Sequence, residues 1–218
     1  MKRSYYLILI VFLVLLVDQA LKIWVKTNLH YYEGFDMLGL SWAKIHFIEN
    51  EGMAFGITFA GKLILSTFRI IMVSFLIYFI RGLHKAGETF GLLVCLCLIL
   101  AGAIGNIIDS AFYGLIFSES YHNGGLAQLF PEGGGYASFL HGKVVDMFYF
   151  PMIDTRFPEW FPLWGGNRFQ FFRPIFNVAD ASISIGVASI LIFHRSFLKQ
   201  DKKKIEAKQP IIPNPQEE

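Results

Sequence analysis

The sequence lacks the motifs of the better-known peptidase classes. There is no His-Glu-x-x-His pair typical of a zinc peptidase, and no Gly-x-Ser-x-Gly motif that would carry a serine nucleophile. The histidines of the predicted outer segments, His46, His122 and His141, do not have the spacing of a metal site. We therefore expect no metal and no organic cofactor.

Cysteine is nearly absent as well. The two that occur, Cys95 and Cys97, lie inside an apolar run and have no Cys or His partner at metal-binding spacing. At this spacing they point to different faces of a helix, and both are expected to pack as small apolar residues. We therefore expect no disulfide.

Charged residues are few, at 17% of 218 residues, and the net charge is only +2. No basic stretch is typical of a nucleic-acid surface, so no nucleic-acid partner is expected. Hydrophobic residues make up 54% of the chain and gather in long runs, which indicates a polytopic membrane protein. We predict an all-α membrane protein with four transmembrane helices, a small extracytoplasmic β-rich element and an interfacial loop.

The predicted organisation is one membrane domain over residues 1–198, followed by a disordered cytoplasmic tail at 199–218. The four spans are expected at about 5–24, 63–80, 90–108 and 178–197, with outer loops at 30–62 and 111–175. Lys2 and Arg3 before the first run resemble the start of a signal peptide, but no small-residue cleavage site follows. The first run is therefore expected to stay as a span.

The two outer loops carry different signals. Alternating apolar and polar residues at 43–48 predict short strands in the first loop. In the second loop, glycines within 114–140 predict a mobile flap, whose role the sequence does not decide. The aromatic residues at 157–172 predict contact with the lipid headgroups.

Basic residues predict the orientation. They concentrate in both terminal segments and in the short loop between the second and third runs, which should therefore be cytoplasmic. Both long loops, and with them the site, would then face outward. The residues are Lys2, Arg3, Arg81, Lys85, Arg195, Lys199 and the lysines that follow.

Polar residues inside the apolar runs indicate functional positions. Asp18 and Lys22 share one helix face, where the alternative is an ion pair at the interface with Lys22 reaching to the headgroups. Gly102, Asn106 and Asp109 form one stripe of the third run. Because Asp109 ends a helix, where the dipole disfavours an anion, a cationic or protic partner is expected nearby.

Two aspartates are the candidates for catalysis. Asp180 lies about one turn inside the last run, at the third position of a helix that Asn177 can cap. Asp146 follows an apolar pair and is expected at the end of a strand or in a tight turn. Two neighbouring carboxylates can share one proton and so serve as acid and base in amide hydrolysis. The alternative is that the two are unrelated structural aspartates.

Five blocks, taken together, resemble lipoprotein signal peptidase, the bacterial signal peptidase II family. They cover all four spans in order. The blocks are Asp18-x-x-x-Lys22, Asn50-x-Gly52-x-Ala54-Phe55, Gly102-Ala-x-Gly105-Asn106-x-x-Asp109, Val144-Val145-Asp146 and Phe176-Asn177-x-Ala179-Asp180.

The resemblance implies a four-helix membrane aspartyl protease that cuts diacylglyceryl-modified prolipoproteins just before the lipid-modified cysteine. It implies that Asp146 and Asp180 are the catalytic pair. Other matching positions would bind substrate or support the pair, with Asp109 in a supporting role. They are Asp18, Lys22, Asn50, Gly102, Asn106, Asp109 and Asn177. The expected partners are the prolipoprotein and membrane lipid, and the chain is expected to be a monomer.

The chain departs from the family pattern in two places. Ser110 stands where the family motif usually has Arg, so either that contact is lost or a residue such as Arg173 or Lys143 supplies the charge. We hypothesise that it is Arg173, which lies next to the start of the fourth span. The segment between Asp109 and Asp146 is also far longer than the family needs.

Other function classes remain open at this point. An intramembrane-carboxylate transporter or proton relay is the main alternative, although four spans without a repeat offer little room for alternating access. A protein of the same fold without activity is another, although both aspartates are present.

Overall fold

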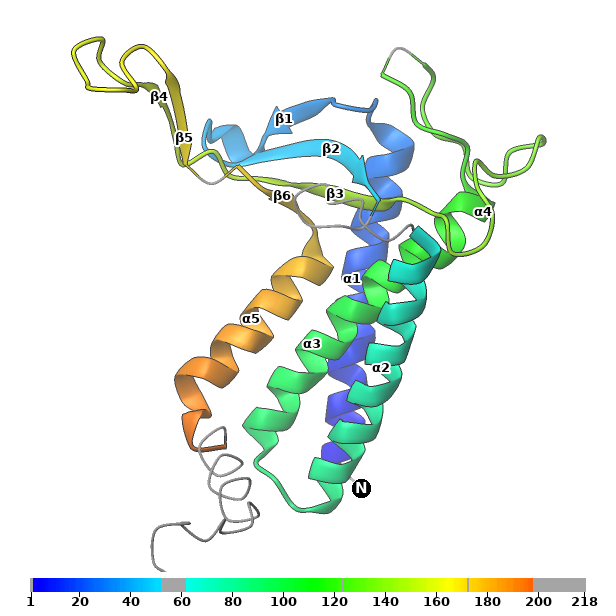
Figure 1. The fold of residues 1–218 in the computed structure, drawn as a ribbon. Helices are drawn as coiled ribbons and strands as arrows, with labels where there is room; N and C mark the ends of the chain where they lie inside the picture. The colour runs from blue at the N-terminus through cyan, green and yellow to red at the C-terminus, as the bar shows by residue number, and fades with distance from the viewer. Residues whose placement is uncertain (1, 52–61, 123, 172, 198–218) are drawn as a thin grey trace, which may run out of the picture.

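The computed structural model describes residues 2–51, 62–122, 124–171 and 173–197. Its helices run side by side beneath a small sheet (Figure 1). They are α1 (Lys2–Asn28), α2 (Lys62–Lys85), α3 (Phe90–Ile108) and α5 (Val178–Phe193). Among the described residues, three helices are long and apolar enough to cross a membrane, and α5 is a shorter apolar helix of 16 residues.

Helix α3 occupies the centre of the bundle and contacts α1, α2 and α5. Its leucines, among them Leu92, Leu93 and Leu96, are buried against α1 and α2. The outer faces of α1 and α2 instead expose large apolar side chains such as Phe12 and Ile71. Helices that are apolar on both the inner and the outer face are typical of a bundle surrounded by lipid.

Glycines on α3 and α5 let these two helices approach closely. A Cβ added at Gly102 would lie 2.2 Å from the carbonyl oxygen of Ala179, and one at Gly186 would lie 2.6 Å from that of Cys95. Small residues at such crossings allow backbone contact. Since Ala179 precedes Asp180, this close packing sets how near Asp180 lies to α3.

The sheet lies over the upper ends of the helices and has the antiparallel order β1-β2-β3-β6 (Figure 1). Its strands are β1 (Gly34–Asp36), β2 (Lys44–Asn50), β3 (Val144–Tyr149) and β6 (Ile175–Phe176). Phe47 and Met147 pack with Val25 of α1 in one buried cluster, which fixes the sheet on the bundle. Asp146 lies in the middle of β3, so the prediction of a strand end or turn was wrong.

Helix α3 continues into a π-helix, η3 (Asp109–Tyr113), and a short helix, α4 (Gly114–Ile116). The chain then forms what we call the insert, residues 117–143. The insert returns to η3 through a hydrogen bond from the Gly142 backbone N–H to the Ser110 carbonyl at 2.8 Å. A Cβ at Gly135 would lie 2.1 Å from the carbonyl oxygen of Gly114. The glycine here serves close packing, while the mobility predicted for this loop stays a prediction.

A hairpin of β4 (Ile153–Arg156) and β5 (Arg168–Phe171) projects from the sheet, away from the helices (Figure 1). Aromatic rings of Phe157, Phe161 and Trp164 stack in its tip, while Trp160 and Leu163 are exposed. The contact of this segment with headgroups stays a prediction.

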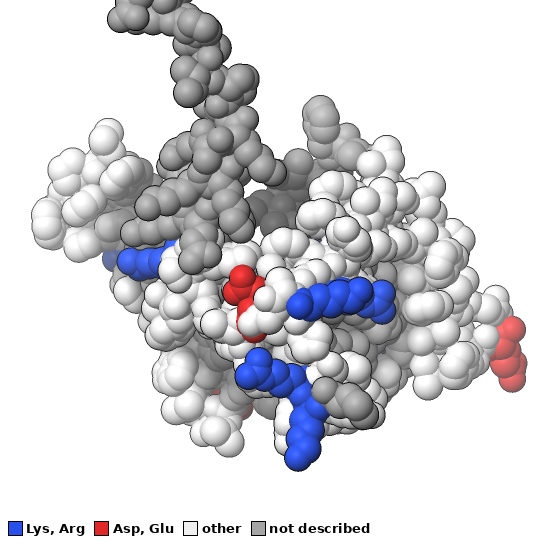
Figure 2. Space-filling model, turned by 90° about the horizontal axis from the view of Figure 1, so that it is seen from below, with Lys and Arg blue, Asp and Glu red and all other residues white. Residues whose placement is uncertain are grey.

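Basic side chains gather at the end of the bundle opposite the sheet (Figure 2). Lys2 and Arg3 begin α1, Arg81 and Lys85 close α2, and Arg195 follows α5. The described termini therefore lie at this same end. The predicted tail at 199–218 lies outside the described residues.

Candidate functional site

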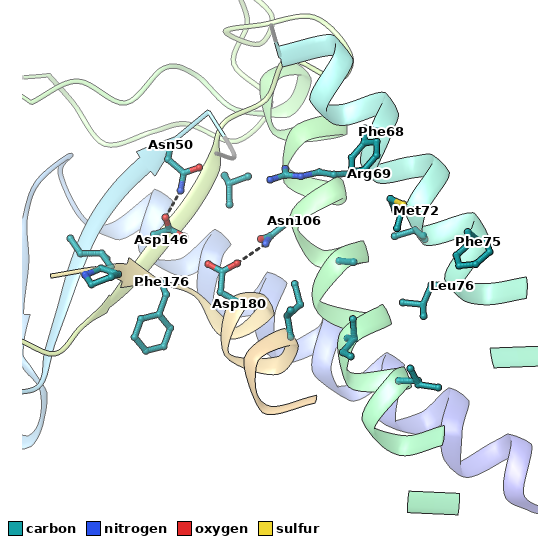
Figure 3. Close-up of a pocket in the computed structure, with 18 of the residues that line it drawn as sticks. Asn50, Phe68, Arg69, Met72, Phe75, Leu76, Asn106, Asp146, Phe176 and Asp180 are labelled. Atoms are coloured by element: carbon teal, nitrogen blue, oxygen red, sulfur yellow. Dashed lines mark hydrogen bonds between the residues drawn. The ribbon is translucent and has the colours of Figure 1, made fainter. Parts of the chain in front are cut away.

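A cavity of about 1070 Å³ opens between the sheet and the helices α2, α3 and α5. Figure 3 shows polar side chains at its end nearest the sheet and apolar side chains of α2 and α3 farther along the helices. The polar lining residues are Asn50, Arg69, Asn106, Asp146, Arg173 and Asp180. The cavity therefore combines a polar end with a long apolar channel.

The start of α5 holds the Asp180 side chain in place. Asn177 is the N-cap, and its Oδ1 accepts a hydrogen bond from the Asp180 backbone N–H at 2.9 Å. The Asp180 carboxylate in return accepts from the Asn177 backbone N–H at 3.4 Å, which completes a capping box. Asn106 Nδ2 donates to the same carboxylate at 2.8 Å (Figure 3). The predicted cap is confirmed, and these hydrogen bonds fix the direction of the Asp180 side chain.

Asp146 has a different environment. Its side chain is buried, and it accepts hydrogen bonds from Asn177 Nδ2, at 2.7 Å, and from Asn50 Nδ2. Burial, together with the negative charge of Asp180, raises the pKa of Asp146 to about 7. The carboxyl group of Asp146 thus keeps its proton over a much wider pH range than a solvated aspartate does.

The asparagines are oriented by a chain of hydrogen bonds that starts in the membrane helices. Lys22 Nζ donates to Asn106 Oδ1 at 3.0 Å, and Asn177 Nδ2 donates to the same oxygen at 3.2 Å. Because its oxygen is engaged, Asn106 must present its amide N–H groups to Asp180. The Lys22 ammonium thereby sets the orientation of Asn106, which lines the cavity.

Lys22 is the centre of a buried charge cluster. Its ammonium lies 2.9 Å from Asp18 and 2.8 Å from Asp109, and all three side chains are almost entirely inaccessible to solvent. The expectation of a cation beside Asp109 is confirmed, and the alternative of an interfacial Asp18–Lys22 pair was wrong. Ion pairs buried in this way persist because each polar atom is hydrogen-bonded.

The two acids of this cluster also hold the elements that carry the candidate pair. Asp18 Oδ1 accepts from the Ala179 backbone N–H of α5 at 2.8 Å. Asp109 Oδ2 accepts from the Val145 backbone N–H of β3 at 3.4 Å. Asp18 and Asp109 therefore fix the backbone directly before Asp180 and Asp146, respectively.

Sequence reasoning missed two members of the network. Gln19 Nε2 donates to Asp109 at 2.9 Å and to Asp18 at 3.1 Å, and its Oε1 accepts from the Tyr113 hydroxyl at 3.1 Å. Gln19 is polar within an apolar run, which is the signal that points to it. Tyr113 is brought to Gln19 by the π-helix, and the apolar sequence around Tyr113 does not predict a π-helix.

An arginine from another helix, Arg69 of α2, reaches Ser110, which stands at the position of the family arginine. Arg69 of α2 points into the cavity (Figure 3), and its Nη1 lies 3.5 Å from Ser110 Oγ. The carboxylates of Asp180 and Asp109 both attract this guanidinium. Arg173 lines the same cavity, and its role in place of the family arginine stays a prediction. Gly52, Ala54 and Phe55 of the second sequence block lie outside the described residues.

Among the residues that the structure describes, no three His, Cys, Asp or Glu side chains form a group that could hold a metal ion. The polar end of the cavity is lined by two carboxyl groups with different surroundings, two asparagines and two guanidinium groups, and the buried Asn177 lies behind them. Such a set can activate a water molecule and supply a proton.

Comparison with known proteins agrees with this chemistry. The Peptidase_A8 family model, described as Signal peptidase (SPase) II, matches residues 10–196. A lipoprotein signal peptidase from Porphyromonas gingivalis is 54% identical over 184 residues, covering 84% of this chain and 80% of that protein. Another, from Amoebophilus asiaticus, is 37% identical over 204 residues, covering 91% and 81%.

A bacterial membrane enzyme solved by the in meso method at 1.9 Å resolution has a similar fold, with a TM-score of 0.57 and 26% identity over 86% of this chain and 90% of that one. The family model spans most of the chain, and the relatives match over most of their own length. The chain therefore belongs to the signal peptidase II family, whose members are the aspartic lipoprotein signal peptidases.

Proposed function

We propose that this chain is a membrane aspartyl endopeptidase that removes signal peptides from diacylglyceryl-modified prolipoproteins, cutting before the lipid-modified cysteine. The observation that carries this proposal is the meeting of Asp146 and Asp180 at the polar end of one cavity. The two come from different elements, β3 and α5, and each is held by asparagine side chains. Family membership supports the substrate class.

The different surroundings of the two aspartates suggest a division of roles. Asp180 acts as the base and takes a proton from a water molecule whose oxygen attacks the scissile carbonyl carbon. Asp146, protonated when substrate binds, donates a hydrogen bond to the carbonyl oxygen. A proton from the pair then passes to the departing amide nitrogen, and the C–N bond breaks. The remaining polar site residues, Asn50, Asn106 and Asn177, hold the pair or bind the peptide.

The apolar channel suits the rest of the substrate. Phe75, Leu76 and Leu96 line it along α2 and α3, well away from the carboxylates. An apolar segment of the signal peptide can lie there, while the diacylglyceryl chains stay in the lipid. A monomer suffices for this arrangement, because every residue of the proposed site comes from one chain.

We place the site on the extracytoplasmic side of a bacterial inner membrane. The basic residues around Lys2, Arg81 and Arg195 lie at the end opposite the sheet, as expected for a cytoplasmic face. Helix α5 serves as the fourth span. Its 16 residues extend over about 24 Å, which is shorter than the hydrocarbon core, so local thinning of the bilayer completes the crossing.

The test uses the full chain in lipid with two matched substrates. One is a diacylglyceryl-modified prolipoprotein, and the other is the same protein with the acceptor cysteine replaced by alanine, which cannot be modified. We expect cleavage of the first alone, leaving the lipid-modified cysteine at the new N-terminus, as read by gel shift and mass spectrometry. Equal cleavage of both substrates contradicts the lipid requirement, and inhibition by a chelator contradicts the mechanism.

The pH profile should follow the proton of Asp146. Above a pH of about 7 this proton is lost, both carboxylates are charged, and the acid of the pair is missing. We therefore expect kcat/KM to fall on the alkaline side, about tenfold per pH unit once the limb is reached. Rate measurements from pH 4 to 10 locate the limb. A profile that stays flat through pH 9 contradicts the role of Asp146 as the proton donor.

A further inference from the structure

A second buried charge lies outside the proposed site. Lys26, one turn beyond Lys22 on α1, has a fully buried side chain, and its ammonium forms an ion pair with Glu49. The Glu49 side chain is only 2% exposed, and neither residue lines the cavity. Taking two charges out of water is unfavourable, so the groups that surround this pair indicate its role.

The insert supplies most of these groups. Ser120 Oγ accepts a hydrogen bond from Lys26 Nζ at 2.8 Å. The rings of Phe117 and Tyr136 have their centroids 5.4 and 5.2 Å from the same nitrogen, within the range of cation–π attraction. We call Phe117, Ser120, Tyr136 and Glu49 the cage. Three of its four members come from the insert.

The cage is connected to both strands that meet at Asp146. Glu49 directly precedes Asn50, the residue whose amide donates to the Asp146 carboxyl group. The Tyr136 hydroxyl accepts a hydrogen bond at 2.6 Å from the backbone N–H of Lys143, three residues before Asp146. In the sheet, Glu49 pairs with Val145, directly before Asp146. The insert thus fixes the end of β2 and the start of β3 against one ammonium.

We propose that the insert is a positioning element, which acts through the Lys26 cage to hold Asn50 against Asp146. The insert makes these contacts while it packs on η3 and α4. It therefore connects the sheet to the end of the helix bundle that lies beneath the sheet. The proposal rests on the proposed function only for its kinetic test. Its structural content, the placement of Asn50 relative to Asp146, can be measured without turnover.

Other charged groups lie near the cage. Glu119 pairs with Lys143 at 3.0 Å, and Glu51 adds a further negative charge that acts on Lys143 and Tyr136. The hydrogen bond from Lys143 lowers the pKa of Glu119. The Tyr31 hydroxyl donates to the Glu49 carbonyl at 3.4 Å, and burial raises the pKa of Tyr31 and of Tyr136. These tyrosines therefore stay neutral through the pH range of the test.

Two small substitutions loosen the cage without removing a charge. Tyr136→Phe deletes the hydroxyl that holds Lys143, and Ser120→Ala deletes the hydroxyl that holds Lys26. Tyr121→Phe is the matched control, because within the described part of the chain the Tyr121 hydroxyl donates to the partly exposed Glu119 side chain and to no member of the cage. Each variant is used as the full chain in lipid, and its folding is checked by thermal unfolding.

We expect Tyr136→Phe and Ser120→Ala to lower kcat about tenfold with KM unchanged, since misplacing a reacting group by 1 Å can cost about 10²-fold. The Asn50 hydrogen bond stabilises the ionised form of Asp146, so its loosening should raise the pKa of Asp146. The alkaline limb should then move to higher pH. Tyr121→Phe should have the same kcat and the same alkaline limb as the unmodified chain.

Infrared titration of the protonated Asp146 carboxyl group, identified by its absence in Asp146→Asn, gives the same answer without substrate. An upward shift in the two cage variants supports the proposal even if the chain cleaves nothing. An Asp146 titration and a kcat equal to those of Tyr121→Phe overturn it. A lower melting temperature with the titration unmoved also overturns it, because the insert would then only stabilise the fold.

Discussion

Replacing either Asp146 or Asp180 by Asn should abolish cleavage while the protein stays folded. Asn has nearly the same size as Asp but cannot take up or hand on a proton, so each change removes the acid or the base. The loss should be roughly 10⁴-fold or more, since such groups act as a unit. The gel shift of a lipid-modified prolipoprotein measures it, and the melting temperature reports folding.

Two further Asp→Asn variants make this result specific. Asp36→Asn changes an exposed aspartate that pairs with Lys44 on the sheet, and it should keep full activity. Asp109→Asn removes one hydrogen-bond acceptor of the Lys22 cluster and should lower stability more than the chemical step. If Asp146→Asn or Asp180→Asn still cleaves at a rate near that of Asp36→Asn, the assignment of the pair fails and Asp109 becomes the next candidate.

Removing the Lys22 ammonium should give the largest loss of stability. Lys22→Met leaves Asp18 and Asp109 buried without their cation, which costs roughly 3–5 kcal/mol of folding free energy. Asn106 also loses the donor that orients it. Unfolding in detergent, by heat or denaturant, measures the change against the unmodified chain.

The exposed pair of Lys44 and Asp36 is the control for this variant. Lys44→Met should change the free energy of unfolding by about 1 kcal/mol or less, because the side chains of Lys44 and Asp36 are both exposed to solvent. Adding Asp109→Asn to Lys22→Met should restore part of the loss, since one unpaired carboxylate disappears. A Lys22→Met protein as stable as Lys44→Met would show that the cluster does not hold the fold.

Local patterns predicted much of the site because they are short-range. Asn177 and Asp180 are three residues apart, so the cap follows from helix geometry alone. The stripe of Gly102, Asn106 and Asp109 likewise follows from the helical period, and each faces the expected inner side. Apolar runs gave the helices for the same reason.

Pairings across long distances in the chain could not be predicted in this way. The position of Asp146 depends on the pairing of β3 with β2, about 100 residues away, and no pattern near Asp146 encodes that register. The π-helix η3 shifts the helical period after Asp109. Tyr113 therefore faces Gln19, which the regular α-helical repeat of α3 does not predict. The glycines of the insert could not decide between a mobile and a packed loop, because mobility and close packing produce the same composition.

The arrangement of the carboxylate pair also has a consequence for biosynthesis. Asp18 binds the backbone of α5 from the first helix of the chain, and Asp180 lies in the last. A nascent chain therefore possesses Asp146 but no second carboxylate until α5 has entered the membrane and reached Asp18. With the proposed catalytic pair, completion of the site coincides with completion of the bundle, and we expect partly inserted chains to be inactive on prolipoproteins.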